Sequence, residues 1–292
     1  MNKKLLYVTF LFFLLFQTFG IAQIPESEKS ALVDLYQATN GDSWSIKWNL
    51  KSDVRQWYGV DIMEGHVVGL NLYKNNLAGK IPSSLKNLKR LEVLDLAFNA
   101  LEGELPTELA ELAALKVLKL EMNSLKGEIP QSFTAMSNLE ELILFDNKLG
   151  GIIPKRIGAI KKLKILDLSN NYLQGSLPES IGELSDLTNL GLSGNKLEGE
   201  ISTGFGNMQN LSELLLAFND FQGTVPKGID ALPYLELVQL QGNNFTSFEN
   251  LQNLQSKNLL VFDTDDLKLN LKYRELFDIE APVANTEFED ED

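Results

Sequence analysis

Asparagine recurs at a constant spacing of 24 residues through most of this chain. The eight copies are Asn75, Asn99, Asn123, Asn147, Asn171, Asn195, Asn219 and Asn243. Each stands in the pattern L-x-L-x-x-N-x-L, of which residues 94–101 are an example. A fixed period of this length indicates a solenoid, in which each repeat forms one coil and contacts only its neighbours. The sequence therefore predicts an elongated array of coils.

The residue types in the pattern have a physical explanation. Leucines two residues apart describe a short strand with one buried face, after which the chain has to turn sharply. An asparagine side chain both donates and accepts hydrogen bonds, so stacked copies satisfy backbone groups that turn inward in successive coils. We therefore expect the eight asparagines to form a structural ladder.

A second constant element, x-L-x-G-x-I/L-P, follows the asparagine, as in residues 77–82 and 173–178. Together the two elements resemble the plant-type class of leucine-rich repeats, found in receptor-kinase ectodomains and polygalacturonase-inhibiting proteins. The resemblance covers residues 67–248; Ser202 replaces the proline of the sixth repeat, and Ser247 the glycine of the eighth. It implies an α/β repeat solenoid, a horseshoe or superhelix. A parallel β-sheet would line its concave face, an extra short strand would lie beside that sheet, and helical or 3-10 turns would form its convex face.

The flanking sequences differ from the repeats, as expected of caps that cover the two ends of a solenoid core. Residues 26–39 have helical spacing of apolar side chains, and three tryptophans follow. We expect residues 23–66 to form an N-terminal cap with the tryptophans in its core. This segment resembles the cap of the same family without the cysteine pair of its plant members, and is similar to exported bacterial leucine-rich-repeat proteins. Residues 249–280 are expected to form a C-terminal cap, with no sorting domain or anchor.

The first residues, 1–22, have the composition of a secretory signal peptide. Two lysines precede an apolar run over residues 5–16, and Gly20 and Ala22 suit cleavage before Gln23. The run is shorter than the roughly 20 apolar residues of a membrane span. We expect a protein that is secreted, periplasmic or at the cell surface, with no membrane span in the mature chain. The alternative is an uncleaved N-terminal anchor.

Charge and composition exclude several classes of partner and site. Without residues 1–22, which hold two lysines and no acid, the net charge of −14 becomes −16. Nucleic acid and anionic membrane are therefore not expected to bind. Residues 281–292 are expected to be an acidic, disordered tail. The chain has no cysteine, so we expect neither a thiol nucleophile nor a thiolate metal site.

The concave face is the candidate binding surface. If the strand leucines point inward, four positions in each repeat point outward, as Val93, Asp95, Ala97 and Phe98 do in the second repeat. Eight strands about 4.8 Å apart make this surface roughly 34 Å long. Its apolar candidates for ligand binding are Tyr73, Val93, Phe98, Val117, Met122, Ile143, Phe145, Ile165, Leu215 and Phe218.

Two interpretations of these apolar residues remain open. The fold does not need apolar side chains at outward positions, so a stripe of them is typical of anchors for a protein or peptide ligand. Alternatively, neighbouring β-branched and aromatic side chains stabilise an exposed sheet without any partner. The outward positions of the sixth repeat, Asn189, Gly191, Ser193 and Gly194, carry no such residue.

Catalytic residues are not evident in the sequence. The single histidine, His66, is expected in a surface loop. A glycosidase needs two carboxylates, and the acidic candidates on the concave face are Glu121, Glu141, Asp146 and Asp167. Nothing distinguishes a pair among them, and an open solenoid face encloses no pocket that would tune a pKa. We therefore predict no catalytic residues, no metal and no cofactor.

The sequence thus predicts a secreted binding scaffold that recognises a protein or peptide ligand through its concave face. The alternative is a glycan- or matrix-binding adhesive protein of the cell surface. Glycan-binding proteins stack sugars on exposed tryptophan or tyrosine, and only Tyr73 provides such a ring on the concave face. This composition favours the protein or peptide ligand.

Overall fold

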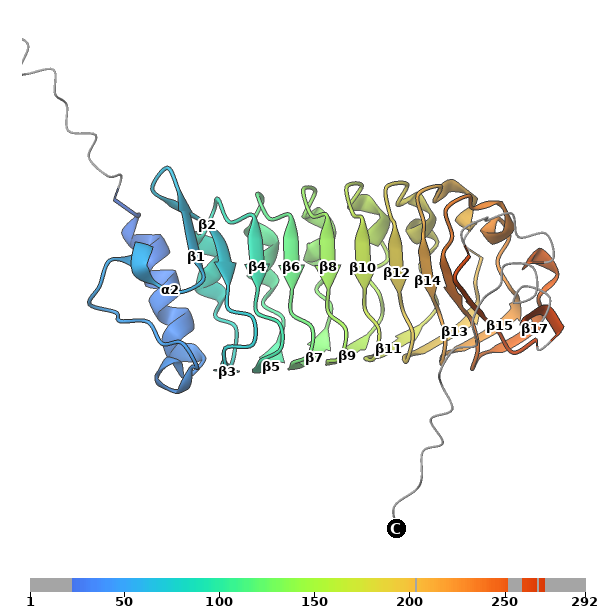
Figure 1. Cartoon of the computed structure of the whole chain (residues 1–292), viewed down its shortest axis with the longest axis horizontal. Helices are drawn as coiled ribbons and strands as arrows, with labels where there is room; N and C mark the ends of the chain where they lie inside the picture. The colour runs from blue at the N-terminus through green and yellow to red at the C-terminus, as the bar shows by residue number, and fades with distance from the viewer. Residues whose placement is uncertain (1–22, 203, 252–258, 267, 271–292) are drawn as a thin grey trace, which may run out of the picture.

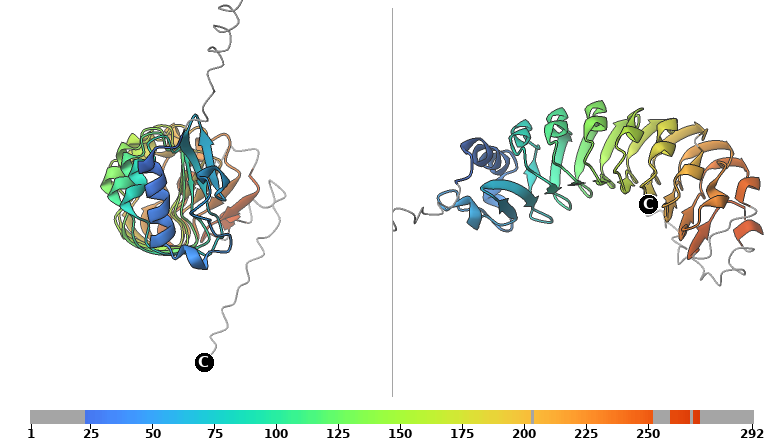
Figure 2. Two further views of the ribbon diagram at one scale, coloured as in Figure 1. Left: turned by 90° about the vertical axis from the view of Figure 1, so that its left-hand side faces the viewer. Right: turned by 90° about the horizontal axis from the view of Figure 1, so that it is seen from above.

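The computed structural model describes residues 23–202, 204–251, 259–266 and 268–270. The predicted signal peptide, residues 1–22, and the predicted tail, residues 281–292, lie outside the described residues. The described chain forms an arc of stacked coils, with strands along its inner side and 3-10 segments along its outer side (Figures 1 and 2). The predicted repeat solenoid with a concave parallel sheet is confirmed.

Ten strands form the concave sheet within the described residues. In spatial order they are β1 (Val60–Met63), β2 (His66–Asn71), β4 (Val93–Asp95), β6 (Val117–Lys119), β8 (Glu141–Ile143), β10 (Ile165–Asp167), β12 (Asn189–Gly191), β14 (Glu213–Leu215), β16 (Leu237–Gln239) and β18 (Val261–Asp263). β1 is antiparallel to β2, and the other strands are parallel. Successive leucines are in register, as Leu94 pairs with Leu118 and Leu118 with Leu142. The sheet exceeds the eight strands expected because β1 and β18 extend it at its two ends.

A second sheet runs beside the first along one flank of the arc (Figure 1). Its strands are β3 (Ala78–Gly79), β5 (Ala100–Glu104), β7 (Ser124–Glu128), β9 (Lys148–Gly151), β11 (Tyr172–Gly175), β13 (Lys196–Glu200), β15 (Asp220–Thr224) and β17 (Asn244–Ser247). From β5 to β13 these strands hold the leucine and glycine of the second constant element, so the extra strand implied by the family resemblance is confirmed.

The outer side consists of 3-10 segments. They are η1 (Gly41–Ser43) and η2 (Val54–Gln56) before the repeats, and then η3 (Ser83–Asn87), η4 (Thr107–Glu111), η5 (Gln131–Ala135), η6 (Ile157–Ala159), η7 (Glu179–Glu183), η8 (Phe205–Asn207), η9 (Ile229–Ala231) and η10 (Glu249–Leu251). The proline of the constant element directly precedes several of them, as Pro82 precedes η3 and Pro130 precedes η5. Its fixed φ suits the start of a helical turn.

The N-terminal end of the core is covered by α2 (Glu26–Ala38) and by the three tryptophans. Trp44, Trp48 and Trp57 are buried, and their rings contact one another in series. Their indole nitrogens donate to the backbone carbonyls of Thr39, Tyr58 and Asn49. The tryptophans are therefore core residues, as expected. Among the described residues, no helix has the length and hydropathy needed to cross a membrane.

The asparagines link each coil to its neighbours through both ends of the side-chain amide. Nδ2 of Asn147 donates to the carbonyl of Leu120 in the preceding coil at 3.0 Å and to that of Leu144 in its own coil at 3.1 Å. Oδ1 of Asn147 accepts from the backbone N–H of Leu125, also in the preceding coil, at 3.0 Å. Asn75 extends the ladder to the cap by bonding both backbone groups of Ile46.

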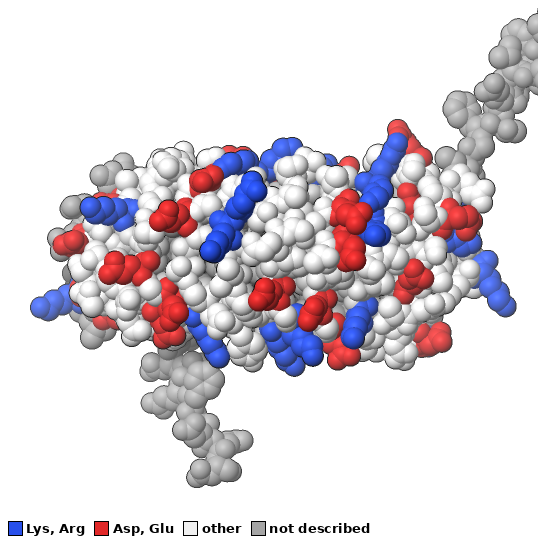
Figure 3. Space-filling view, turned by 180° about the vertical axis from the view of Figure 1, so that it is seen from behind, with Lys and Arg blue, Asp and Glu red and all other residues white. Residues whose placement is uncertain are grey.

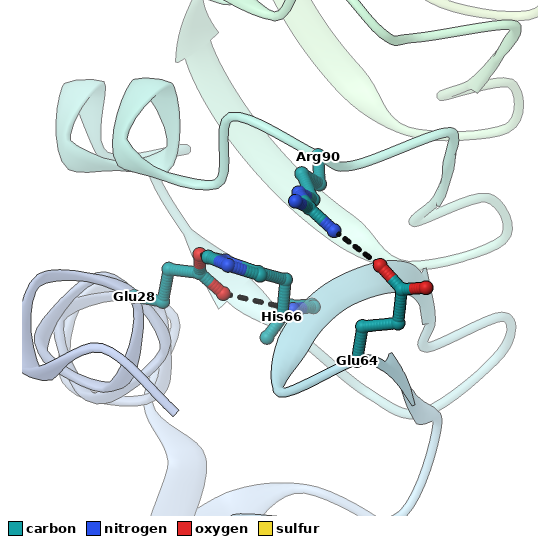
Figure 4. A network of polar contacts seen from close by, with 5 residues as sticks. Glu28, Glu64, His66 and Arg90 are labelled. Atoms are coloured by element: carbon teal, nitrogen blue, oxygen red, sulfur yellow. Dashed lines mark hydrogen bonds and ion pairs between the residues drawn. The ribbon is translucent and has the colours of Figure 1, made fainter. Parts of the chain in front are cut away.

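The placement of His66 in a surface loop was wrong. His66 begins strand β2 and is half-buried, with its Nδ1 2.6 Å from Oε1 of Glu28 (Figure 4). Oε2 of Glu28 accepts from the backbone N–H of Val67 at 2.8 Å. Glu28 is buried on α2, because its helical position faces the first strand of the repeats. The pair therefore joins the cap helix to the solenoid.

Candidate functional site on the concave face

The ten apolar candidates all lie on the strands of the concave sheet or on the turns that follow them, and none belongs to the fully buried core. Tyr73, Val93, Phe98, Met122 and Phe218 are exposed, and Phe218 is the most exposed of them at 61%. Val117, Ile143, Phe145, Ile165 and Leu215 are half-buried. Each candidate therefore presents at least part of its side chain to solvent.

The register divides these candidates into three groups instead of one continuous stripe. The first group lies on the first three coils and also includes Met122: Val93 pairs with Val117, and the rings of Tyr73 and Phe98 are in contact, with centroids 5.0 Å apart. The central group consists of Ile143, Phe145 and Ile165, on two adjacent coils. Leu215 and Phe218 lie two coils further on, beyond the sixth repeat. Half-buried Leu237, which the sequence analysis did not include, pairs with Glu213 beside this last group.

One of the four positions predicted to point outward is mostly covered. In the second to eighth repeats it is the residue that follows the second buried leucine, and we name these residues the inner row: Ala97, Glu121, Phe145, Ser169, Ser193, Ala217 and Gln241. Ala97 is fully buried, so its predicted exposure was wrong; its methyl group is too short to reach solvent between larger neighbours. Glu121 is only 8% exposed. The inner row is therefore the floor of the concave face.

The residue after each inner-row member has a left-handed backbone. Phe98, Met122 and Phe218 have φ of 55°, 54° and 54°. Gly194 and Gly242 occupy the same position in other repeats, and so do Asp146 and Asn170. Glycine, asparagine and aspartate tolerate this conformation, whereas a bulky side chain in it is strained. Three repeats of the fold thus carry exposed apolar side chains at a position that disfavours them.

Replacing Phe218 with asparagine is expected to raise the free energy of unfolding by about 1 kcal/mol, because asparagine relieves the left-handed strain. Phe218→Ala is the matched control, since it removes the ring and keeps the strain. Urea unfolding followed by circular dichroism measures both variants. Equal stability of the asparagine and alanine variants would show that the backbone at residue 218 is not strained.

Glu121 is a buried carboxylate of the concave face whose pKa is raised. Burial raises its pKa, and the nearby charges of Asp95 and Asp167 raise it further, whereas its own backbone N–H and Lys119 act in the opposite direction. Lys119 is itself paired with Glu141, with Nζ and Oε2 3.0 Å apart. The face therefore holds a buried carboxylate between two other acids.

The raised pKa predicts a specific pH dependence of stability. Between the ordinary carboxyl pKa and the raised pKa of Glu121, the folded protein binds more protons than the unfolded chain, so stability falls as pH rises through this window. Glu121→Gln removes that contribution. The free energy of unfolding of this variant, relative to wild type, is expected to increase between pH 4 and pH 7. Parallel pH profiles for the two proteins, measured by urea unfolding, would contradict this assignment.

The sequence analysis missed a row of ion pairs at the edge of the concave face. Nζ of Lys116 lies 2.6 Å from a carboxylate oxygen of Glu92, and Nζ of Lys164 lies 2.6 Å from one of Glu140. These hydrogen bonds raise the pKa of both lysines. The signal was present in the sequence, because Glu and Lys alternate at the 24-residue period. These residues stand directly before the first outward position of each strand, as Glu92 stands before Val93.

Among the residues that the structure describes, the other surfaces differ from the concave face. The convex face carries charges of both signs interspersed with uncharged residues (Figure 3). A hollow of about 640 Å³ is open to solvent and lies on the flank around Ile152, Leu177 and Ser202, and none of the ten candidates lines it. Within the described part of the chain, no group of three or more His, Cys, Asp or Glu side chains is arranged to hold a metal ion. The concave face is therefore the surface that combines apolar anchors with perturbed charge.

Comparison with protein families identifies the repeats. A leucine-rich-repeat model matches residues 137–197, and a second leucine-rich-repeat model matches residues 66–88 and 90–112. Comparison with proteins of curated function gives no match.

Solved structures provide the wider relationship. The chain is 35% identical to a TDR receptor, with a TM-score of 0.65, over 66% of this chain and 34% of the receptor. It is 29% identical to the Arabidopsis receptor kinase HAESA, with a TM-score of 0.59, over 68% of this chain and 34% of that one. It therefore spans about a third of the length of these two receptor structures. It is also 32% identical to the BIR2 ectodomain from Arabidopsis thaliana, with a TM-score of 0.52, over 60% of this chain and 95% of that one. With 95% of that ectodomain matched, and with both constant elements in their expected strands, this chain belongs to the plant-type leucine-rich-repeat family.

Proposed function

We propose that this protein is an exported, non-catalytic scaffold that binds a protein or peptide ligand on its concave face. The observation that carries the proposal is the conformation of Phe98, Met122 and Phe218. These side chains are exposed, and their left-handed backbone raises the energy of the folded state. Strained residues that stabilise no core are typical of functional sites, and exposed aromatic and methionine side chains are typical of interface anchors.

The family relationship supports the same class of ligand. The HAESA structure contains the peptide hormone IDA and the co-receptor SERK1. Leucine-rich-repeat ectodomains are generally binding modules without catalytic activity, and an open concave face suits an extended ligand better than a reaction that requires exclusion of water.

The proposal includes the organisation of the chain. Residues 1–22 are a signal peptide removed on export, and residues 67–248 form the binding array between the caps at 23–66 and 249–280. Burial of the tryptophans and of the apolar face of α2 supports the N-terminal boundary, because these side chains cover the end of the leucine core. The ligand is then encountered outside the cytoplasm.

Capture by the mature chain, residues 23–292, tests the proposal. The concave variant carries Phe98→Ser, Ile143→Ser, Phe145→Ser and Phe218→Ser. A matched control variant removes exposed apolar side chains that are not concave-face candidates, by Ile152→Ser, Tyr172→Ser and Tyr234→Ser. Each protein is shown to be folded by circular dichroism and then immobilised. Extracellular proteins, peptides and glycans from the source organism are passed over all three, and the retained material is identified by mass spectrometry.

We expect wild type and the control variant to retain the same protein or peptide, and the concave variant to lose it. Equal retention by all three would assign the apolar groups to sheet packing and reject the proposal. Selective loss of a glycan, in place of a polypeptide, would reject the ligand class and support the adhesive alternative.

A further inference from the structure

The inner row carries buried polar atoms that lack partners. Within the described residues, five buried side-chain atoms have no hydrogen-bond partner, and four of them belong to this row: Oε2 of Glu121, Oγ of Ser169, Oγ of Ser193 and Oε1 of Gln241. These are all the polar side chains of the row. Each such atom costs free energy when it stays unpaired. A ligand that supplies hydrogen bonds along the row removes this cost.

The backbone fixes the row as a continuous line across the coils. The backbone carbonyl of each inner-row residue accepts a hydrogen bond from a backbone N–H of the preceding coil. The donor is the residue that directly follows the inner-row position there: Phe98 donates to Glu121, and Asn170 donates to Ser193. Coils about 4.8 Å apart place Glu121 and Gln241, five coils apart, about 24 Å from each other. An extended polypeptide covers that length with about seven residues.

In the sixth repeat, side chains of the preceding coil lie against the row, and the predicted outward position Gly191 is buried. A Cβ on Gly191 would lie 2.4 Å from Oδ1 of Asp167, and a Cβ on Gly194 would lie 2.3 Å from Oδ1 of Asn170. These two residues flank Ser193 and have no side chain above the floor. Glycine at these positions leaves room for the polar side chains of Asp167 and Asn170 from the preceding coil.

The charge around Glu121 is net negative, because Asp95 and Asp167 outnumber the one nearby cation, Lys119. Oδ1 of Asp95 accepts from the N–H of Ala97 at 3.1 Å, and Oδ1 of Asp167 accepts from that of Ser169 at 3.0 Å, so the backbone holds both carboxylates in place. The lysine on the same strand, Lys119, is engaged by Glu141. A cation from a ligand would therefore meet three carboxylates.

We propose that the ligand is an extended polypeptide segment that lies along the inner row and places an arginine or lysine side chain at Glu121, between Asp95 and Asp167. This inference rests on the proposed function and specifies its ligand. The basic side chain donates to the unpaired Oε2, and the ligand backbone pairs with the hydroxyls of Ser169 and Ser193. Apolar residues of the ligand on either side of this basic residue contact the central group, around Ile143, and the group around Val93 and Phe98. Arginine fits the carboxylates better than lysine because its guanidinium bonds two oxygens at once.

Two pools of synthetic octapeptides test the proposal. Both are N-acetylated and C-amidated, and both contain Phe, Leu, Ser and Gly at random positions. One pool has a fixed arginine, and the other has citrulline in its place, which has the same shape without the charge. The pools are passed over immobilised mature wild type, Glu121→Gln, Ser193→Val and the concave variant. Glu198→Gln, which changes an acid on the flanking sheet, is the matched control.

Wild type and Glu198→Gln are expected to retain the arginine pool about tenfold more strongly than the citrulline pool, as one charge-assisted hydrogen bond predicts. Glu121→Gln is expected to lose that preference, and Ser193→Val to retain less of both pools. Equal retention of the two pools by wild type, or an unchanged preference in Glu121→Gln, would overturn the inference. If the inference is overturned in this way but the concave variant retains neither pool, the proposed function stands. If the concave variant retained both pools as well as wild type does, the proposed function would fail with the inference.

Discussion

Replacing Asn147 with alanine is expected to lower the free energy of unfolding by about 3–5 kcal/mol, because several buried groups lose their partners together. Asn147 donates from Nδ2 to the carbonyls of Leu120, Leu144 and Phe145 and accepts from the N–H of Leu125. Alanine reproduces none of these bonds, and the coils on both sides leave no room for bulk water. The loss should appear as a lower urea midpoint and as faster hydrogen exchange at the amide of Leu125.

Asn138→Ala is the matched control for this variant. Asn138 lies on an exposed turn of the same coil, where its Nδ2 donates to the carbonyl of Ala113. Water can replace that bond, so the control is expected to lose less than about 1 kcal/mol. A comparable loss for the two variants would mean that the ladder contributes no more than a surface hydrogen bond.

Replacing Glu28 with alanine is expected to lower the free energy of unfolding by about 2–4 kcal/mol and to detach the cap helix from the first repeat. The substitution leaves the buried N–H of Val67 without a partner and removes the contact with His66. A buried donor left unpaired costs about 1–3 kcal/mol, and a hydrogen bond to a charged group contributes about as much. Hydrogen exchange measures the effect by region: protection should fall in α2 and β2 first.

Glu28→Gln distinguishes the hydrogen bonds from packing. The glutamine amide has the same shape, and its oxygen can still accept from the N–H of Val67. This variant is expected to lose clearly less stability than Glu28→Ala. Equal losses, or protection that falls evenly along all the coils, would contradict a role for Glu28 in joining the cap to the repeats.

Much of the fold was predictable from the sequence because its pattern is local and repeated. The 24-residue period fixes one strand and one turn per coil, and each coil meets the same neighbours, so the assignment of one repeat holds for the next. The buried leucines of the strands, the second strand that holds the glycine, and the buried tryptophans of the cap were all predicted correctly.

The candidate site was predictable only in part. Period-two alternation identified the outward strand positions, such as Val93 and Ile143, but it does not apply where the strand ends. There the chain turns, and Ala97 is buried while Phe98 is exposed in a left-handed conformation. Alternation does not predict which of these two neighbours is exposed, because the exposure of their side chains depends on the turn that the asparagine stabilises.

The sequence by itself determined the solenoid, the asparagine positions and the concave face that carries apolar side chains. Only the tertiary structure decided that His66 contacts Glu28, 38 residues away, and that Glu121 is a buried carboxylate beside acids from other coils. The physical reason is the range of the interactions. The hydrogen bonds of the asparagines and the packing of the leucines join each coil to its neighbours in the same way. The residues that form them therefore recur in the sequence at the 24-residue period. Burial and electrostatics at one residue sum over side chains from several coils, which no single repeat encodes.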